Sequence, residues 1–292
     1  MIKLDKKSKG KIGILVIALG RYDAFWAELY KSCEKYFLPQ WDKQYFVYTD
    51  NENLKYKKKK NVTTFYQKKM GWPWDSMMRF EMFYRRKPML ERCDYLFFLN
   101  INLICKKEIG EEILPKEKHD WLTVCTHSGY YNKPVNTFPY DRNPASTAYI
   151  PYNQGKHYAP GGFNGGRSAE FLKFCEVCMH NVRADMKNNV IALWHDESHL
   201  NKYILDKNPL ITPINYMYPK NVKWLKESFF SKDIKMELRD KVHYGGHYYL
   251  RGAIDIKNTR WNKLKYHILK AFALSQEKKD EYELMLTRLY YD

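Results

Sequence analysis

Apolar residues in the first half of the chain alternate between short continuous runs and stretches with helical spacing. A continuous run over 12–18 ends at Gly20, which is typical of a strand buried on both faces of a parallel sheet. Helical spacing follows over 22–37. Further strands are predicted at 44–48, 62–66 and 95–99, with a helix over 75–84. The order strand, helix, strand, strand, helix, strand predicts an α/β fold with a mostly parallel sheet.

The second half adds one more strand and a long irregular segment. A strand is predicted over 121–125, and a polar and aromatic loop follows to about residue 160. Loops of that length are uncommon unless they bind something. The glycine-rich stretch 161–166 comes next, and helices are predicted from residue 168 onward and over 197–205. We expect the loop and the glycines to belong to a binding site.

The last stretch differs in character from the rest. Trp261, Leu264, Ile268 and Phe272 fall on one helical face, and Lys263, Lys265 and Lys270 flank it. A basic amphipathic helix can lie on an anionic membrane, which would make the protein peripheral to the membrane. The interpretation that we favour is a terminal helix packed on its own domain, followed by a second helix over 280–290. The chain is therefore divided into a main domain, 1–255, and a helical extension, 256–292.

Composition narrows the range of partners. The chain has 292 residues, of which 45% are apolar and 16% aromatic, so it can bury a substantial core. Its formal charge of +17 favours phosphate-bearing or polyanionic partners. Nucleic acid is not expected, because zinc-finger spacing and a helix-turn-helix pattern are both lacking.

Cysteines and the N-terminus bear on the compartment. The six cysteines are scattered, mostly within apolar runs, and predict reduced core thiols in a cytosolic protein. The basic N-terminus is followed by about eight apolar residues, too few for a membrane span. We expect a cytoplasmic protein, with contact to the inner face of the membrane as the open alternative.

The sequence Asn100-Ile101-Asn102 follows the strand over 95–99, where ligands bind in open α/β sheets. Many nucleotide-sugar transferases have Asp-x-Asp at this point, because two carboxylates hold a divalent cation against the diphosphate. Asparagine keeps the shape and loses the charge, whereas hard cations prefer carboxylate oxygens. We therefore predict a nucleotide-sugar site without a metal.

The densest polar cluster is Trp194-His195-Asp196-Glu197-Ser198-His199. His195 and His199 would share a helix face. The zinc-peptidase motif, however, needs Glu directly after the first His, where this chain has Asp196. Glu197 is better interpreted as a nucleophile or as an electrostatic stabiliser of a cationic sugar, although a helix-capping pair is the simpler alternative.

These segments together resemble glycosyltransferase family 6, which includes the histo-blood-group A and B transferases, α1,3-galactosyltransferase and bacterial relatives. The matching stretches are 16–22, 45–50, 76–82, 95–102, 140–142, 146–151, 161–166 and 194–203. The resemblance implies a GT-A fold, Rossmann-like and in a single domain. It also implies retaining α1,3 transfer of galactose or N-acetylgalactosamine from a UDP-sugar to a β-galactoside.

The resemblance also implies which residues form the site. Glu197 would be catalytic. The donor-binding residues would be Ile17, Ala18, Leu19, Tyr22, Arg79, Asn100, Ile101, Asn102, Pro160, Gly161, Gly162 and Asp196. In the family, a C-terminal tail closes over UDP with basic residues, and Lys241 and Arg251 are the candidates for that donor-binding role here. The acceptor-binding residues would be His119, Trp194 and Glu197.

Two of these positions, Pro160 and Gly162, separate N-acetylgalactosamine from galactose donors in the family. Glycine at the second leaves room for an acetamido group and favours UDP-N-acetylgalactosamine. The two asparagines predict that no cofactor is needed, with Mn²⁺ as the alternative. The acceptor segment after Thr212-Pro213 and the C-terminal tail depart from the family pattern.

The expected partners are a UDP-sugar and an oligosaccharide, lipopolysaccharide or glycolipid acceptor, fucosylated or not. Two other functions stay open. One is a metal-dependent transferase that uses another UDP-sugar. The other is an inactive, lectin-like glycan-binding protein, against which the intact cluster His195-Asp196-Glu197 argues.

Overall fold

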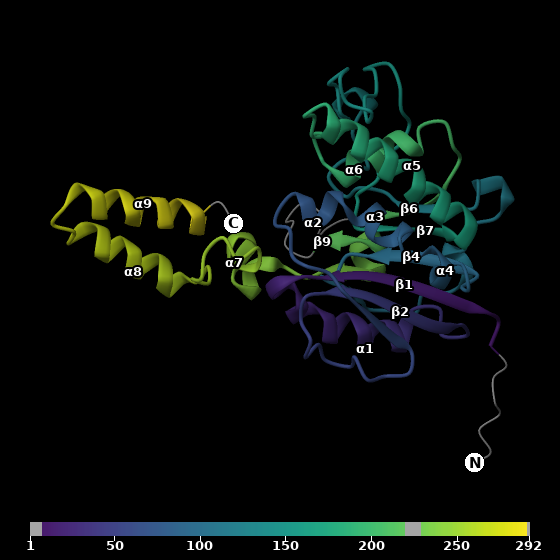
Figure 1. Ribbon diagram of the computed structural model, residues 1–292, viewed down its shortest axis with the longest axis horizontal. Helices are drawn as coiled ribbons and strands as arrows, with labels where there is room; N and C mark the ends of the chain where they lie inside the picture. Colours follow the sequence, from purple (N-terminus) through teal and green to yellow (C-terminus); the bar gives the residue numbers. More distant parts are fainter. Residues whose placement is uncertain (1–7, 220–228, 291–292) are drawn as a thin grey trace, which may run out of the picture.

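A seven-stranded, mostly parallel sheet forms the centre of the protein in this computed structural model, which describes residues 8–219 and 229–290 (Figure 1). Its strands, in spatial order, are β3 (Val62–Tyr66), β2 (Asp42–Thr49), β1 (Lys11–Ala18), β4 (Tyr95–Leu99), β7 (Phe163–Arg167), β6 (Leu122–Cys125) and β8 (Leu210–Thr212). Only β7 runs against its neighbours within this sheet. The predicted α/β fold is confirmed.

Helices cover both faces of this sheet. On one face, Ile14 and Val16 of β1 pack in a common core with Leu29 of α1 (Trp26–Tyr36). On the other face, Leu15 shares a core with side chains of α3 (Arg79–Tyr84) and α5 (Ser168–Lys187). The continuous apolar run of β1 is explained by this double burial. Three further helices in this part of the chain are α2 (Trp74–Met77), α4 (Lys87–Leu90) and α6 (Asp196–Tyr203).

A small second sheet joins the C-terminal segment to the end of β4. It contains β5 (Leu103–Cys105), β10 (Met236–Leu238) and β9 (Tyr218–Pro219), in that order. Because β5 follows β4 after a short turn, β10 brings the residues after 238 towards the carboxyl end of the main sheet.

The glycine-rich stretch contains a strand that the sequence did not predict. β7 includes Gly165 and Gly166, and glycine disfavours strands. Close packing explains the choice, because a Cβ on Gly165 would lie 2.2 Å from Cδ1 of Phe97, and one on Gly166 would lie 2.4 Å from the carbonyl oxygen of Trp121. The predicted helix over 75–84 is interrupted at Met78, and the helix predicted from Tyr22 begins with 3-10 turns over Gly20–Phe25.

The C-terminal helices extend away from the sheet (Figure 1). They are α7 (Gly246–Leu250), α8 (Arg260–Ala271) and α9 (Gln276–Tyr290). Leu286 and Leu289 of α9 are buried, and α9 contacts α7, whereas α8 has no buried residue. The expectation that the apolar face of α8 packs on the main domain is therefore wrong.

Among residues 8–219 and 229–290, none of the helices combines the length and the apolar character that crossing a bilayer requires.

All six cysteines are buried free thiols, as predicted.

Candidate functional site

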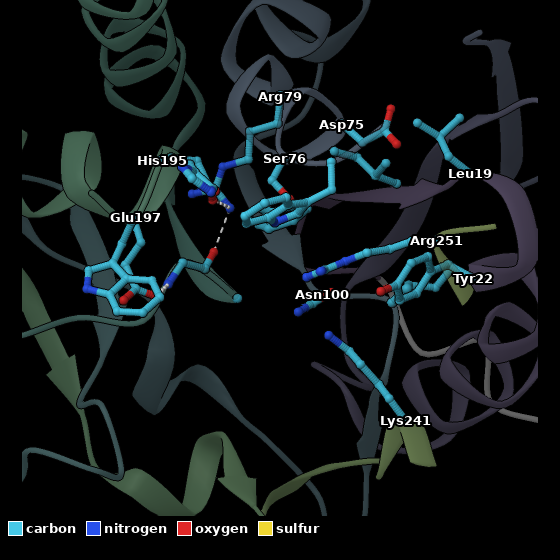
Figure 2. A pocket seen from close by; sticks show the side chains of 18 of the residues that line it. Leu19, Tyr22, Asp75, Ser76, Arg79, Asn100, His195, Glu197, Lys241 and Arg251 are labelled. Carbon is cyan, nitrogen blue, oxygen red and sulfur yellow. Dashed lines mark hydrogen bonds and ion pairs between the residues drawn. The ribbon is translucent and has the colours of Figure 1, made fainter. Parts of the chain in front are cut away.

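A cavity of about 430 Å³ opens at the carboxyl ends of β1 and β4 (Figure 2). This is the edge where open α/β sheets bind ligands. Five segments meet there. They follow β1, follow β4, precede β7, begin α6 and belong to the C-terminal segment. Its walls include Ile17, Leu19, Tyr22, Lys69, Trp72, Asp75, Ser76, Arg79, Phe98, Asn100, Ile101, Gly161, Gly162, Trp194, His195, Asp196, Glu197, Met217, Lys241 and Arg251.

Glu197 is held in place by two hydrogen bonds. Its Oε2 accepts from the backbone N–H of Gly161 at 2.7 Å, and its Oε1 accepts from the Tyr158 hydroxyl at 2.5 Å. Removal from bulk water raises the pKa of Glu197 to about 7, although both hydrogen bonds favour the ionised form. The side chain is thus an oriented carboxyl group that changes charge near neutral pH.

Arg79 is buried beside Glu197, with 1% of its surface exposed. Its Nη1 donates to the carbonyl oxygen of Gly161 at 2.6 Å and forms an ion pair with Oδ2 of Asp196 at 3.1 Å. Its Nε and Nη2 have no hydrogen-bond partner among the described residues. Arg79 lines the cavity, where its positive charge favours a ligand that carries anionic oxygens.

Lys241 and Arg251 form a cationic wall opposite Glu197 (Figure 2). Burial, and then the charge of Arg251, lower the pKa of Lys241 to about 8. Nζ of Lys241 lies 5.5 Å from the ring centre of Tyr22, and the guanidinium of Arg251 lies 4.7 Å from that of Trp72. Two positive charges confined in one wall repel each other, and an anionic ligand would relieve that repulsion.

The two asparagines after β4 have different surroundings. Asn100 lines the cavity. Asn102 is buried outside the cavity. Its side-chain Nδ2 donates to the backbone carbonyl oxygen of Arg239 at 2.9 Å, and its backbone carbonyl oxygen accepts from the backbone N–H of Arg239 at 2.7 Å. The side chain of Asn102 therefore links the end of β4 to the C-terminal segment.

The side chains at these two positions do not fit a divalent cation bound in the way that the two carboxylates of Asp-x-Asp bind one. Of the two asparagines, only Asn100 lines the cavity, and its neutral amide shares that wall with the cations Lys241 and Arg251 (Figure 2). Within the described ranges, His, Cys, Asp and Glu side chains form no group of three or more that could hold a metal ion.

Most of the predicted site residues line this cavity, and four do not. Ala18 and Pro160 are buried next to lining residues, and Asn102 makes the contact described above. His119 precedes β6, and its Nδ1 accepts from the backbone N–H of Lys116 at 3.1 Å. Since β6 runs towards the cavity, His119 lies at the opposite end of the strand, and the structure does not bring it together with the other predicted acceptor residues.

The sequence reasoning missed His127 and Tyr158. His127 follows the carboxyl end of β6, and its ring centre lies 5.5 Å from that of Tyr158, the hydrogen-bond partner of Glu197. Burial lowers the pKa of His127 to about 4, so its ring is neutral at physiological pH. Its place after a predicted strand was the signal that could have found it.

A second missed group comes from the segment before α2. Trp72 lies 5.1 Å from the His195 ring, centre to centre, and Asp75 accepts hydrogen bonds from the backbone N–H groups of Met70 and Gly71. Lys69 donates to the carbonyl oxygen of Arg251 at 2.5 Å and so connects this segment to the cationic wall.

Comparison with known proteins shows the family of this chain. The model of glycosyltransferase family 6 matches residues 3–243. The O-antigen biosynthesis glycosyltransferase WbnI of Escherichia coli is 34% identical over 230 residues, which are 79% of this chain and 94% of that protein.

Vertebrate proteins match over a shorter part of their length. Globoside alpha-1,3-N-acetylgalactosaminyltransferase 1 of Gallus gallus is 30% identical over 69% of this chain and 60% of its own. Histo-blood group ABO system transferase 1 of Rattus norvegicus is 32% identical over 68% of this chain and 58% of its own. The chain thus spans about three fifths of the length of these two relatives.

Proposed function

Because the chain belongs to glycosyltransferase family 6, we propose that it moves N-acetylgalactosamine, or galactose, from a UDP-sugar to a β-galactoside-ended glycan. We propose that the anomeric configuration is retained and that no metal ion takes part. The observation that carries this proposal is the arrangement of the cavity, with the fixed carboxyl group of Glu197 on one side and the cations Lys241 and Arg251 on the other.

The diphosphate would bind at the cationic wall. A leaving UDP carries negative charge that must be stabilised as the sugar departs, and confined cations do this strongly in a site shielded from water. Lys241 and Arg251 would supply this charge in place of a divalent cation. Tyr22 and the residues at the end of β1 would contact the uridine.

The donor sugar would lie between Arg79, Asp196 and Glu197. The positive charge of Arg79, which lines the cavity, suits sugar hydroxyl or phosphate oxygens. The Glu197 carboxylate would stand beside the anomeric carbon and stabilise its positive charge, or form a covalent glycosyl intermediate with it. In either route Glu197 acts in its ionised form.

The preference for N-acetylgalactosamine is supported by Gly162, which lines the cavity beside Asn100. A Cβ at this position would lie 3.2 Å from Cβ of Asn100 and 2.5 Å from Cε of Met217. Glycine therefore leaves space that a larger side chain would remove, and an acetamido group would use that space.

The acceptor would enter on the side of Trp194, which lines the cavity and is 51% exposed. WbnI is named for O-antigen biosynthesis, and the names of the two vertebrate relatives refer to globoside and to the histo-blood group ABO system. We therefore propose an oligosaccharide, lipopolysaccharide or glycolipid acceptor, fucosylated or not. A cytoplasmic location is supported by the six free thiols.

The decisive experiment is a transfer assay with four donors in excess EDTA. UDP-N-acetylgalactosamine, UDP-galactose, UDP-glucose and UDP-N-acetylglucosamine would be offered with β-galactoside acceptors, with and without an α1,2-fucose. We expect transfer from the first donor, in EDTA, with an α1,3 linkage. Activity that needs Mn²⁺ would overturn the metal-free mechanism, and glycan binding without transfer from any donor would indicate a lectin-like protein.

A further inference from the structure

The C-terminal helix α8 presents an apolar stripe to solvent. Trp261, Leu264, Ile268 and Phe272 recur at spacings of three and four and so share one face. Their exposed fractions are 80%, 49%, 50% and 80%, and Leu274, just beyond the helix, is fully exposed. Single exposed apolar residues are ordinary, but a row of four along one short helix and its C-cap marks an interaction surface.

The opposite face of α8 is already occupied by α9. Nζ of Lys263 lies 4.5 Å from the ring centre of Tyr290, and Lys270 forms an ion pair with Glu283 at 2.5 Å. The rings of Tyr266 and Tyr282 are 5.9 Å apart. The stripe is therefore the outer face of the α8–α9 hairpin, which projects from the main domain (Figure 1).

The charge of α8 identifies the partner. This helix has four basic residues and no acidic one, whereas α9 has four acidic and three basic residues. On the helix surface, Arg260 and Lys265 lie on the two sides of the apolar stripe. An apolar stripe bordered by cations fits a surface that is apolar inside and anionic at its rim, as an anionic lipid bilayer is.

We propose that the outer face of α8 binds the surface of anionic bilayers, with Trp261, Leu264, Ile268, Phe272 and Leu274 inserted among the lipids and Arg260 and Lys265 at the headgroups. A second copy of the chain is a poorer partner, because a symmetric contact through α8 would bring its cations against identical cations. The family match ends at residue 243, so this surface lies outside the matched region.

The hairpin is connected to the site already described. Leu286 and Leu289 of α9 are buried, α9 contacts α7, and Arg251 follows α7 directly. Binding through α8 would therefore hold the cavity close to the lipid surface. The binding itself does not depend on the proposed transfer, and it is measured without any sugar.

The test is flotation of the full chain with vesicles of phosphatidylcholine alone and of phosphatidylcholine mixed with an equal amount of phosphatidylglycerol. We expect binding to the anionic vesicles, weakened by added salt, since exposed charges are screened. The double variant Trp261→Ser/Phe272→Ser should lower the partition coefficient by roughly a hundredfold, about tenfold for each aromatic side chain. Arg260→Glu/Lys265→Glu should abolish the preference for anionic vesicles.

The matched control is Phe229→Ser, because Phe229 is also 80% exposed but lies in a different segment. It should bind vesicles as the unchanged chain does, and circular dichroism would show that all variants are folded. Failure of the unchanged chain to bind, or equal binding by the double aromatic variant, would overturn the proposal. So would a dimer in sedimentation velocity that disappears in that variant, since it would identify a second copy as the partner.

Discussion

The hydroxyl of Tyr158 donates a hydrogen bond to Oε1 of Glu197 over 2.5 Å, from the end of the long loop to the start of α6. Burial raises the pKa of Glu197, and this hydrogen bond lowers it, so the value of about 7 reflects two opposing effects. Tyr158 is thus placed to set both the orientation and the charge of the carboxyl group.

We predict that Tyr158→Phe shifts the pH dependence of transfer. If Glu197 works as a carboxylate, activity rises as pH increases through its pKa and is lost below it. Without the hydroxyl, the charged form loses a donor and the pKa rises further. The acidic limb of kcat/KM should move to higher pH by about one unit, equivalent to the free energy of one hydrogen bond.

Tyr140→Phe is the control for this shift. The Tyr140 hydroxyl donates to the carbonyl oxygen of His157 at 2.6 Å, and its ring lies 5.5 Å from that of Tyr158. In Tyr140→Phe the acidic limb of kcat/KM should stay at the pH of the unchanged protein. An unchanged limb in Tyr158→Phe as well would contradict the role given to the Tyr158–Glu197 bond.

A second prediction concerns Glu197→Gln. The amide keeps the size of the side chain and removes the negative charge that stabilises an oxocarbenium-like transition state. The kcat should fall by roughly a hundredfold or more, while UDP affinity measured by calorimetry stays nearly unchanged. Glu277→Gln, on the exposed surface of α9, is the control. A variant Glu197→Gln with nearly full kcat would refute the catalytic role.

The fold was largely predictable, because burial on both faces of β1, β2 and β4 leaves a continuous apolar run in the sequence. β7 was not, because its glycines are required by the close approach of Phe97, in the neighbouring strand β4, and of Trp121, which directly precedes β6. A contact between distant segments leaves no local pattern in either of them.

The same limit applies to the site. Glu197 and Arg79 were found through their motifs, whereas Tyr158 lies in a loop without periodicity and becomes relevant only because α6 places Glu197 beside it. Asn102 shows the reverse case. Its motif predicted a contact with the sugar donor. The strand β10, however, returns to this point, and the amide group of Asn102 donates a hydrogen bond to Arg239 instead.

A third prediction follows from the lowered pKa of Lys241, about 8. The ammonium group is charged below that value and loses its charge as pH rises through it. UDP affinity measured in EDTA should therefore be nearly constant from pH 6 to about pH 7 and weaken at pH 9. Lys241→Met should weaken UDP binding at pH 7 by roughly tenfold to a hundredfold and remove this pH dependence. Lys58→Met, in an exposed loop, is the control; equal affinity of both variants would exclude Lys241 from the UDP site.

Fourth, the two asparagines should respond differently to aspartate. Asn102→Asp would place a buried negative charge against the carbonyl oxygen of Arg239 and should lower the free energy of unfolding by roughly 3 kcal/mol. In Asn100→Asp the new carboxylate would face the cavity and its cations, and the free energy of unfolding should change by less than about 1 kcal/mol. Urea denaturation of both variants measures this. Equal losses would mean that Asn102 is not held as the structure shows.

The last prediction tests how Gly162 sets donor choice. In Gly162→Ala the new methyl group would meet Cε of Met217 at 2.5 Å and Cβ of Asn100 at 3.2 Å. Met217 is a flexible side chain that can move, but the methyl group then fills space beside Asn100, where the acetamido group would lie. The ratio of kcat/KM for UDP-N-acetylgalactosamine over UDP-galactose should fall by roughly tenfold or more. In Gly162→Ala/Met217→Ala the shorter side chain at position 217 would open space next to the new methyl group, and part of the preference should return. If the single variant kept the original ratio, Gly162 would not define the acetamido pocket, and the preference for N-acetylgalactosamine would lose its support.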